Sequence, residues 1–223
     1  MDVLFDLDGT LVEYERPGQV VLEAAFDRVG VEPFFEVTDF EVRYDDFFEQ
    51  SDSIVELRER IFADIATSRD VDPELGVEVA RAYDDERDHT RVRLLPGATD
   101  VLDALADRPL AMVTNGDPEM QRPKLEATGL DAYFETVVYA GHDAAPKPDP
   151  APFHLALDAI DGSPDQAIYV GNDPNADVGG AAAAGLDSVW LRNGATTRPR
   201  TKPTYTIESL SELFETPILE RSV

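Results

Sequence analysis

The sequence of 223 residues predicts an α/β protein with a doubly wound parallel β-sheet and an inserted, all-helical domain. Three observations carry this prediction. Short apolar segments alternate with helical patterns of about 10–15 residues, which indicates βαβ units and a parallel sheet. Proline and glycine stand at the boundaries of these helical patterns. A long segment after the first strand offers helical patterns but no convincing run of buried strands.

Five short apolar segments are expected to form the strands of the sheet. Each is bounded by polar or turn residues and has the length of a strand buried on both faces. In chain order they are Val3–Leu7, Leu110–Thr114, Val137–Ala140, Ala167–Gly171 and Ser188–Leu191. The segment Asn193–Pro203, rich in Arg, Thr and Pro, is expected to be a loop before a last short strand and helix.

Four helical patterns lie between these strands. A proline at the start of a helix and a glycine just after its end are typical boundary residues. Pro96 precedes the first pattern, and Gly129 and Gly185 follow the second and the fourth. The predicted helices are Gly97–Asp107, Pro118–Thr128, Pro150–Ile160 and Asn175–Ala184.

The segment from Glu15 to Arg93 differs from the rest of the chain. Its helical patterns cover Gln19–Val29, Ser53–Ala66 and Glu74–His89. We therefore predict two domains, a sheet-based core made of residues 1–14 and 94–223 and a helical domain made of residues 15–93.

The composition excludes several classes of protein. A hydrophobic content of 43% suits a folded chain, and no stretch approaches the roughly 18 apolar residues of a membrane helix. The N-terminal residues do not show the pattern of a signal peptide, which is a basic region followed by an apolar segment and a cleavage site. The absence of cysteine excludes disulfides and thiolate metal sites. A cytoplasmic protein without membrane partners is the expectation, whereas oligomeric state is left open.

The charge is strongly negative, because 46 acidic residues face 19 basic ones and give a formal charge of −27. Such a surface repels itself in dilute buffer, but at molar salt the Debye length falls to roughly 3 Å. We therefore expect a protein from an extreme halophile. The alternative, an acidic surface for a basic partner, predicts clustered acids, whereas these are spread along the chain. Nucleic acids are excluded as partners, since their phosphates need positive charge.

Two carboxylates lie at the end of the first predicted strand, one inside it and one just after it. Asp6 and Asp8 alternate along the chain, so they are expected to point toward one crevice. Gly9 then gives a turn its backbone freedom, and Thr10 offers a hydroxyl and an N–H to an anion. Two carboxylates this close can hold a divalent cation while one attacks an electrophile and the other moves a proton.

Polar residues also follow three other predicted strands. Ligands of open parallel sheets bind where the strands end at their carboxyl side. The sequence places Thr114-Asn115-Gly116, then Lys147, and finally Gly171-Asn172-Asp173-Pro174-Asn175-Ala176-Asp177 at such ends. Together with the first acid pair, they predict a metal-assisted phosphoryl-transfer site.

These four stretches resemble motifs I to IV of the haloacid dehalogenase-like hydrolases, in the helical-cap group (C1, subfamily I). The resemblance covers nearly the whole chain and implies a Rossmann-like core with a cap inserted after motif I. It also implies that Asp6 is a nucleophile forming an aspartyl-phosphate and that Asp8 is the general acid and base. Thr114 would bind the phosphoryl group, and Lys147 would neutralise charge on it.

The resemblance further implies a Mg²⁺ ion and a small phosphorylated metabolite as substrate. Beside Asp6 and the Asp8 carbonyl, a motif IV side chain would bind the metal. The family commonly has an acid where Asn172 stands, so Asn172 and Asp173 both remain candidate ligands, with Asp177 orienting the site. The substrate-binding positions would be Gly9, Thr10, Asn115 and Gly116.

The sequence thus favours a Mg²⁺-dependent phosphatase. A 2-haloacid dehalogenase-type hydrolase is one alternative, although a halide needs no proton to leave and Asp8 would then have no task. A phosphomutase of the same superfamily would use the same acids and is not separated from a hydrolase. A non-catalytic binding protein is a third alternative, supported by Asn172 alone.

Overall fold

The structure, a computed structural model, describes residues 1–48, 50–51, 53–195 and 197–220. It divides into two compact units, one of Met1–Glu13 with Val92–Val223 and one of Tyr14–Arg91. The predicted helical domain, 15–93, lies within two residues of the second unit at each end.

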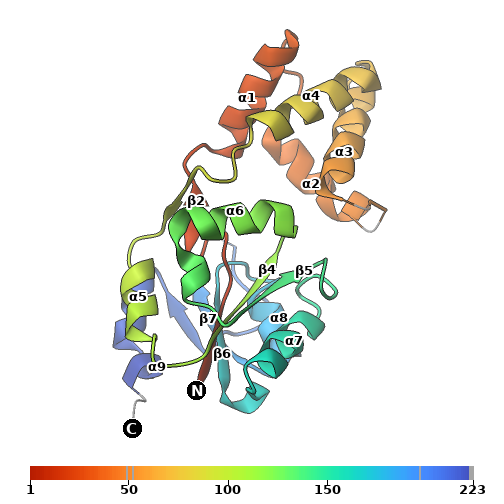
Figure 1. The fold of residues 1–223 in the computed structure, drawn as a ribbon. Helices are drawn as coiled ribbons and strands as arrows, with labels where there is room; N and C mark the ends of the chain where they lie inside the picture. The colour runs from red at the N-terminus through yellow and green to blue at the C-terminus, as the bar shows by residue number, and fades with distance from the viewer. Residues whose placement is uncertain (49, 52, 196, 221–223) are drawn as a thin grey trace. The chain divides into compact units, whose positions relative to one another are not determined.

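The first unit is built on a six-stranded sheet in the order β5-β4-β1-β6-β7-β8 (Figure 1). All adjacent strands are parallel. The strands are β1 (Asp2–Phe5), β4 (Leu110–Asn115), β5 (Thr136–Ala140), β6 (Ala167–Gly171), β7 (Asp187–Leu191) and β8 (Tyr205–Ile207). Since the chain adds β4 and β5 on one side of β1 and the later strands on the other, the winding reverses at β1, where ligands of such sheets bind.

Helices cover both faces of the sheet. One face packs on α5 (Ala98–Ala104), α6 (Pro118–Thr128) and the C-terminal turns, with Val3 and Phe5 at the centre of its core. The other face packs on α7 (Ala151–Ala159) and α8 (Val178–Ala183), with Leu4 at its centre. Alternate residues of β1 are therefore buried on opposite faces, which explains its continuous apolar run. The remaining short helices are η1 (Leu130–Ala132), η2 (Pro164–Gln166), η3 (Leu210–Glu215) and α9 (Pro217–Glu220).

In the part of the second unit that the structure describes, the helices are α1 (Gly18–Val29), α2 (Val37–Phe48), α3 (Ile54–Ser68) and α4 (Pro73–Glu86). Its core combines aliphatic and aromatic side chains, and Phe35 makes edge-to-face contacts with Phe26 and Phe62 at centroid distances of 5.1 and 4.7 Å. Gly76 lets α4 approach α3 closely, because a Cβ there would lie 2.4 Å from the Phe62 carbonyl oxygen. The buried Arg58 is paired with Asp84 across the same two helices.

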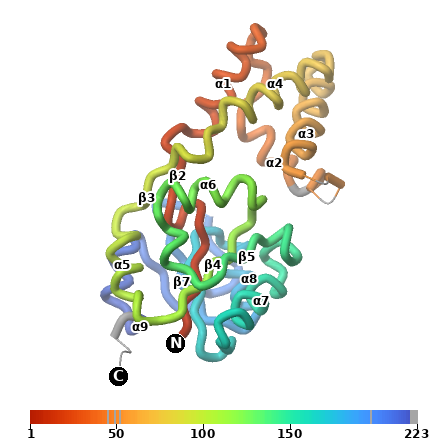
Figure 2. Tube along the Cα trace, viewed as in Figure 1, coloured from red at the N-terminus to blue at the C-terminus, as the bar shows by residue number. Residues whose placement is uncertain are grey.

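The predicted fold class is confirmed, and the differences are local. Helix α2 was not predicted. A two-stranded sheet of β2 (Val12–Tyr14) and β3 (Val92–Leu94) was also missed, and it lies where the chain passes from one unit to the other (Figure 2). Helix α8 begins three residues later than predicted, because residues 173–177 form a turn of their own. The predicted loop after β7 precedes β8 as expected, and its residue 196 lies outside the described residues.

Among the helices that the structure describes, none combines the length and the apolar character needed to cross a bilayer.

We expect the free energy of unfolding to increase with KCl concentration. The formal charge of −27 repels itself over a Debye length of about 10 Å at 0.1 M salt and about 3 Å at 1 M. Thermal unfolding at a series of KCl concentrations measures the effect. The triple variant E32Q, E126Q and D131N, which neutralises three exposed carboxylates, should show a weaker dependence. A midpoint that does not change with KCl would contradict the charge argument.

Candidate active site

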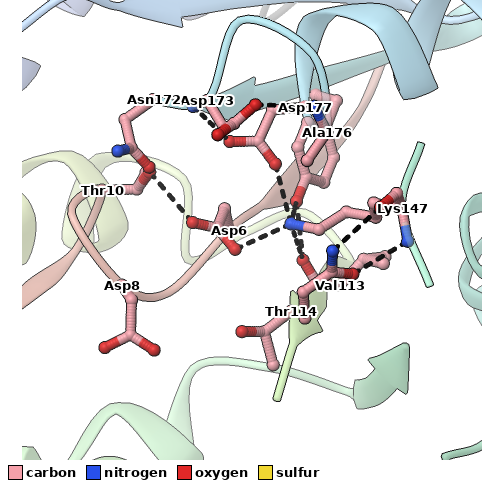
Figure 3. Close-up of polar contacts among 12 residues, drawn as sticks. Asp6, Asp8, Thr10, Val113, Thr114, Lys147, Asn172, Asp173, Ala176 and Asp177 are labelled. Carbon is pink, nitrogen blue, oxygen red and sulfur yellow. Dashed lines mark hydrogen bonds and ion pairs between the residues drawn. The ribbon is translucent and has the colours of Figure 1, made fainter. Parts of the chain in front are cut away.

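A buried lysine joins two carboxylates at the carboxyl end of the sheet. Asp6 follows β1 directly, and its backbone N–H donates to Val170 of β6 at 2.9 Å. The Lys147 Nζ donates to Asp6 Oδ1 at 2.8 Å and to Asp177 Oδ1 at 2.7 Å (Figure 3). The side chains of Lys147 and Asp177 are each 2% exposed and that of Asp6 is 9% exposed. The structure therefore brings together three residues that lie far apart in the sequence.

The charges of this cluster do not balance, because two carboxylates share one ammonium group. Burial raises the pKa of Asp6 to about 7, although the Lys147 ammonium opposes the increase and Asp177 adds to it. Burial alone would lower the pKa of Lys147, but Asp177 and Asp6 outweigh it and raise that pKa. Lys147 is therefore held as a cation beside a carboxylate that has an excess of negative charge around it.

Two further residues fix the position of Lys147. The Tyr169 hydroxyl accepts from Lys147 Nζ at 2.8 Å and donates to the Val113 carbonyl oxygen at 2.6 Å. The Asn115 side chain binds the Lys147 backbone twice, accepting from its N–H at 2.8 Å and donating to its carbonyl at 2.9 Å. Asn115, predicted to bind substrate, thus uses both ends of its amide to hold the loop that carries Lys147.

A second group of oxygen atoms lies beside Asp6. The Thr10 hydroxyl lies 3.4 Å from Asp6 Oδ2 and 3.2 Å from Asn172 Oδ1 (Figure 3). Thr10 uses its backbone N–H within the turn, where it donates to Leu7. Gly9 has a φ of 73°, and a Cβ there would lie 2.6 Å from Asn172 Nδ2. The turn after β1 therefore requires glycine both for its conformation and for the approach of Asn172.

The two acids of motif IV, Asp173 and Asp177, have partners within the protein. Asp173 Oδ1 accepts from the backbone N–H groups of Asn175 and Ala176, each at 2.7 Å. Asp177 Oδ2 accepts from the Asp173 N–H at 2.7 Å. Gly171 leaves room for this arrangement, since a Cβ there would lie 2.4 Å from the Asp177 carboxyl. Of the three candidates, Asn172 is the one whose side-chain oxygen shares a neighbour with Asp6, because both contact the Thr10 hydroxyl.

Asp8 lies apart from the Lys147 cluster (Figure 3). Two side chains of helix α6 hold its carboxylate. Lys124 Nζ donates to both Asp8 carboxylate oxygens at 2.8 Å, and Gln121 Nε2 donates to Oδ2 at 2.9 Å. The same Gln121 nitrogen lies 2.8 Å from Thr114 Oγ1. Gly116, another predicted substrate-binding residue, admits this side chain, because a Cβ there would lie 2.5 Å from Gln121 Nε2.

Three residues of this site were missed at the sequence level: Gln121, Lys124 and Tyr169. Gln121 and Lys124 lie inside a predicted helix, where polar side chains usually face solvent. The available signal was the rarity of lysine, since the chain has three lysines and two of them are in the site. Tyr169 sits in an apolar strand and gave no separate signal.

Comparison with known proteins gives consistent matches. A family model described as haloacid dehalogenase-like hydrolase matches residues 3–185. A phosphoserine phosphatase from Thermus thermophilus is 31% identical over 95% of this chain and 97% of its own length.

Solved structures have a similar fold. The HAD-hydrolase YfnB from Bacillus subtilis, bound to magnesium, superposes with a TM-score of 0.75 at 24% identity over 98% of both chains. A 2-haloacid dehalogenase from Pseudomonas syringae has a TM-score of 0.67 at 26% identity over 96% of both chains.

Proposed function

Since the chain belongs to the haloacid dehalogenase-like hydrolases, we propose that it is a Mg²⁺-dependent phosphatase that hydrolyses a small phosphorylated metabolite through an aspartyl-phosphate. The observation that carries the proposal is the different environment of the two aspartates after β1. Asp6 is buried on Lys147, whereas the Asp8 side chain is 39% exposed. The buried Asp6 is thus suited to nucleophilic attack in a site without water, and the more exposed Asp8 is suited to proton exchange.

The proposed reaction has two steps. Asp6 attacks phosphorus and the bond to the leaving oxygen breaks, while Asp8 donates its proton to that oxygen. Asp8 then takes a proton from water, which attacks the aspartyl-phosphate and regenerates Asp6 with release of inorganic phosphate. Lys147 offsets negative charge on Asp6 and on the transferring phosphoryl oxygens, and the Thr114 hydroxyl donates to that group.

The residues around Asp6 fit a Mg²⁺ ion. The donors available are hard oxygens, as Mg²⁺ prefers: the Asp6 carboxylate, the Asp8 carbonyl and the Asn172 amide oxygen. The excess negative charge around Asp6, whose pKa burial raises to about 7, is a further reason to expect a cation there. When bound, the ion would withdraw charge from the phosphoryl oxygens. Asp173 and Asp177 would hold the turn that presents Asn172.

The contacts of Asp8 favour phosphorus over carbon as the electrophile. A dehalogenase releases halide, which needs no proton, and so has no use for a second acid. Here Asp8 is held by two buried side chains, Gln121 and Lys124, on one helix. Burying the Lys124 ammonium beside Asp8 costs desolvation energy, which supports a role for the Asp8 carboxylate in the reaction.

We expect the protein to release 4-nitrophenol from 4-nitrophenyl phosphate in molar KCl, and to lose this activity with EDTA. Added Mg²⁺ should restore it, because the cation compensates the charge around Asp6. Absorbance at a series of Mg²⁺ concentrations measures both effects. A folded, metal-loaded protein without activity would instead favour the phosphomutase or a binding role.

Two variants test the metal ligand in the same assay. Asn172→Ala removes the amide oxygen beside Asp6 and should raise the Mg²⁺ concentration needed for half-maximal activity about tenfold or more, the usual cost of a disrupted metal environment. Asp173→Asn keeps the Oδ1 that caps the following turn and should change this concentration little. The reverse order would assign the metal to Asp173.

Further proposals concern the environment of the enzyme. The charge of −27 favours a salt-rich cytoplasm and disfavours nucleic acid as a partner. The phosphatase relative supports a small phosphorylated molecule as substrate.

A further inference from the structure

Two buried side chains on α6 contact Asp8 but have no part in the reaction steps above. Gln121 and Lys124 are 0% and 1% exposed and stand three residues apart, on one face of the helix. A buried ammonium group is costly unless it is paired, and this one donates to both oxygens of Asp8. The helix therefore places one charge and one amide against the carboxylate that the proposed reaction uses twice.

We propose that Gln121 and Lys124 are positioning residues for the proton transfers of Asp8, and that Gln121 also directs the Thr114 hydroxyl proton toward the substrate. This inference rests on the proposed phosphatase function. The proton itself moves from the Asp8 carboxyl to the leaving oxygen and later from water to Asp8. Lys124 and Gln121 keep their own protons throughout.

The geometry around Asp8 restricts its rotation. Three contacts of 2.8, 2.8 and 2.9 Å fix both carboxylate oxygens. At 39% exposure, the side chain would otherwise have several orientations available in solvent. A proton donor must lie within hydrogen-bond reach of the leaving oxygen, and orientation fixed beforehand removes an entropic part of the barrier.

Gln121 links Asp8 to Thr114. Its Nε2 donates at 2.8 Å to Thr114 Oγ1, so the hydroxyl accepts here and its own proton is available for the phosphoryl group. The nitrogen must face these two acceptors, since a rotated amide would set Oε1 against the Asp8 carboxylate. Oε1 is left buried without a hydrogen-bond partner among the described residues, which costs about 1–3 kcal/mol. This unfavourable burial occurs in Gln121, whose nitrogen contacts both Asp8 and Thr114, two residues of the proposed reaction.

Esters with different leaving groups distinguish positioning of the proton donor from a merely structural role. 4-Nitrophenol leaves readily as an anion, whereas phenol, with a pKa near the value of about 10 for tyrosine, depends more on a donated proton. We expect Lys124→Met and Gln121→Met each to lower kcat/KM for phenyl phosphate about tenfold more than for 4-nitrophenyl phosphate, a fraction of the 10²–10⁴ that proton transfer contributes. Asp8→Asn should shift the ratio in the same direction and further.

Controls separate positioning from folding. Methionine keeps the length and packing of the lysine stem, so Lys124→Met is expected to fold. Leu125→Ala weakens the packing of the same helix without touching Asp8, and should leave the ratio of the two kcat/KM values unchanged. If Lys124→Met and Gln121→Met lower kcat/KM equally for the two esters, the inference is wrong, while the proposed phosphatase function is unaffected. If the native enzyme hydrolyses neither ester, the proposed function fails first and this inference fails with it.

Discussion

Asp6→Asn is expected to abolish hydrolysis, lowering kcat by about 10⁴-fold or more, as loss of a covalent nucleophile does in other hydrolases. The amide cannot form the acyl-phosphate, so no phosphoryl group should be found on the protein by mass spectrometry after rapid acid quenching. The protein should remain folded. Removing this charge leaves Lys147 with Asp177 alone, and burial already disfavours the ionised form of Asp6 by raising its pKa to about 7.

Asp2→Asn is the matched control, because Asp2 lies at the opposite end of the same strand. It should keep native activity and native phosphorylation. Activity that survives in Asp6→Asn would assign the nucleophile to another residue. Loss of folding in that variant would contradict the charge argument for the Lys147 cluster.

Lys147→Met is expected to lower the free energy of unfolding by about 3–5 kcal/mol, the usual cost of removing one partner from a buried ion pair. Asp6 and Asp177 would then face each other without a cation, at 9% and 2% exposure. Activity should fall by about 10²–10³-fold or more, because charge on the transferring group is no longer offset. Urea unfolding and steady-state kinetics measure the two losses.

A second substitution distinguishes charge from packing. In the double variant Lys147→Met/Asp177→Asn, one of the two unpaired carboxylates is gone, so part of the lost stability should return. Lys202→Met, at an exposed lysine, should change the stability by no more than about 0.5 kcal/mol. Strictly additive losses at Lys147 and Asp177 would show that the two groups are not coupled.

Much of the fold could be predicted because it is encoded locally. A strand buried on both faces must be apolar throughout, so β1, β4 and β6 are visible as continuous runs in the sequence. Helix boundaries at Gly129 and Gly185 follow from backbone conformation, since both glycines have positive φ. Helix α2 escaped prediction although Val37, Phe40, Tyr44, Phe47 and Phe48 recur at helical spacing and pack against the core of their unit. Its many aromatic and β-branched residues are weak helix formers, so the local signal for a helix is poor.

The α/β class and the polar residues at the strand ends can be deduced from the order of amino acids alone. Asp6, Thr114 and Lys147 could be named because a parallel sheet gathers its carboxyl ends at one edge. The contacts that hold these residues in place become visible in the folded chain. The contacts of Asp8 with Gln121 and Lys124 join positions 113 and 116 residues apart. They depend on which face of α6 packs over the sheet, and that is settled by the packing of the whole core rather than by any local pattern.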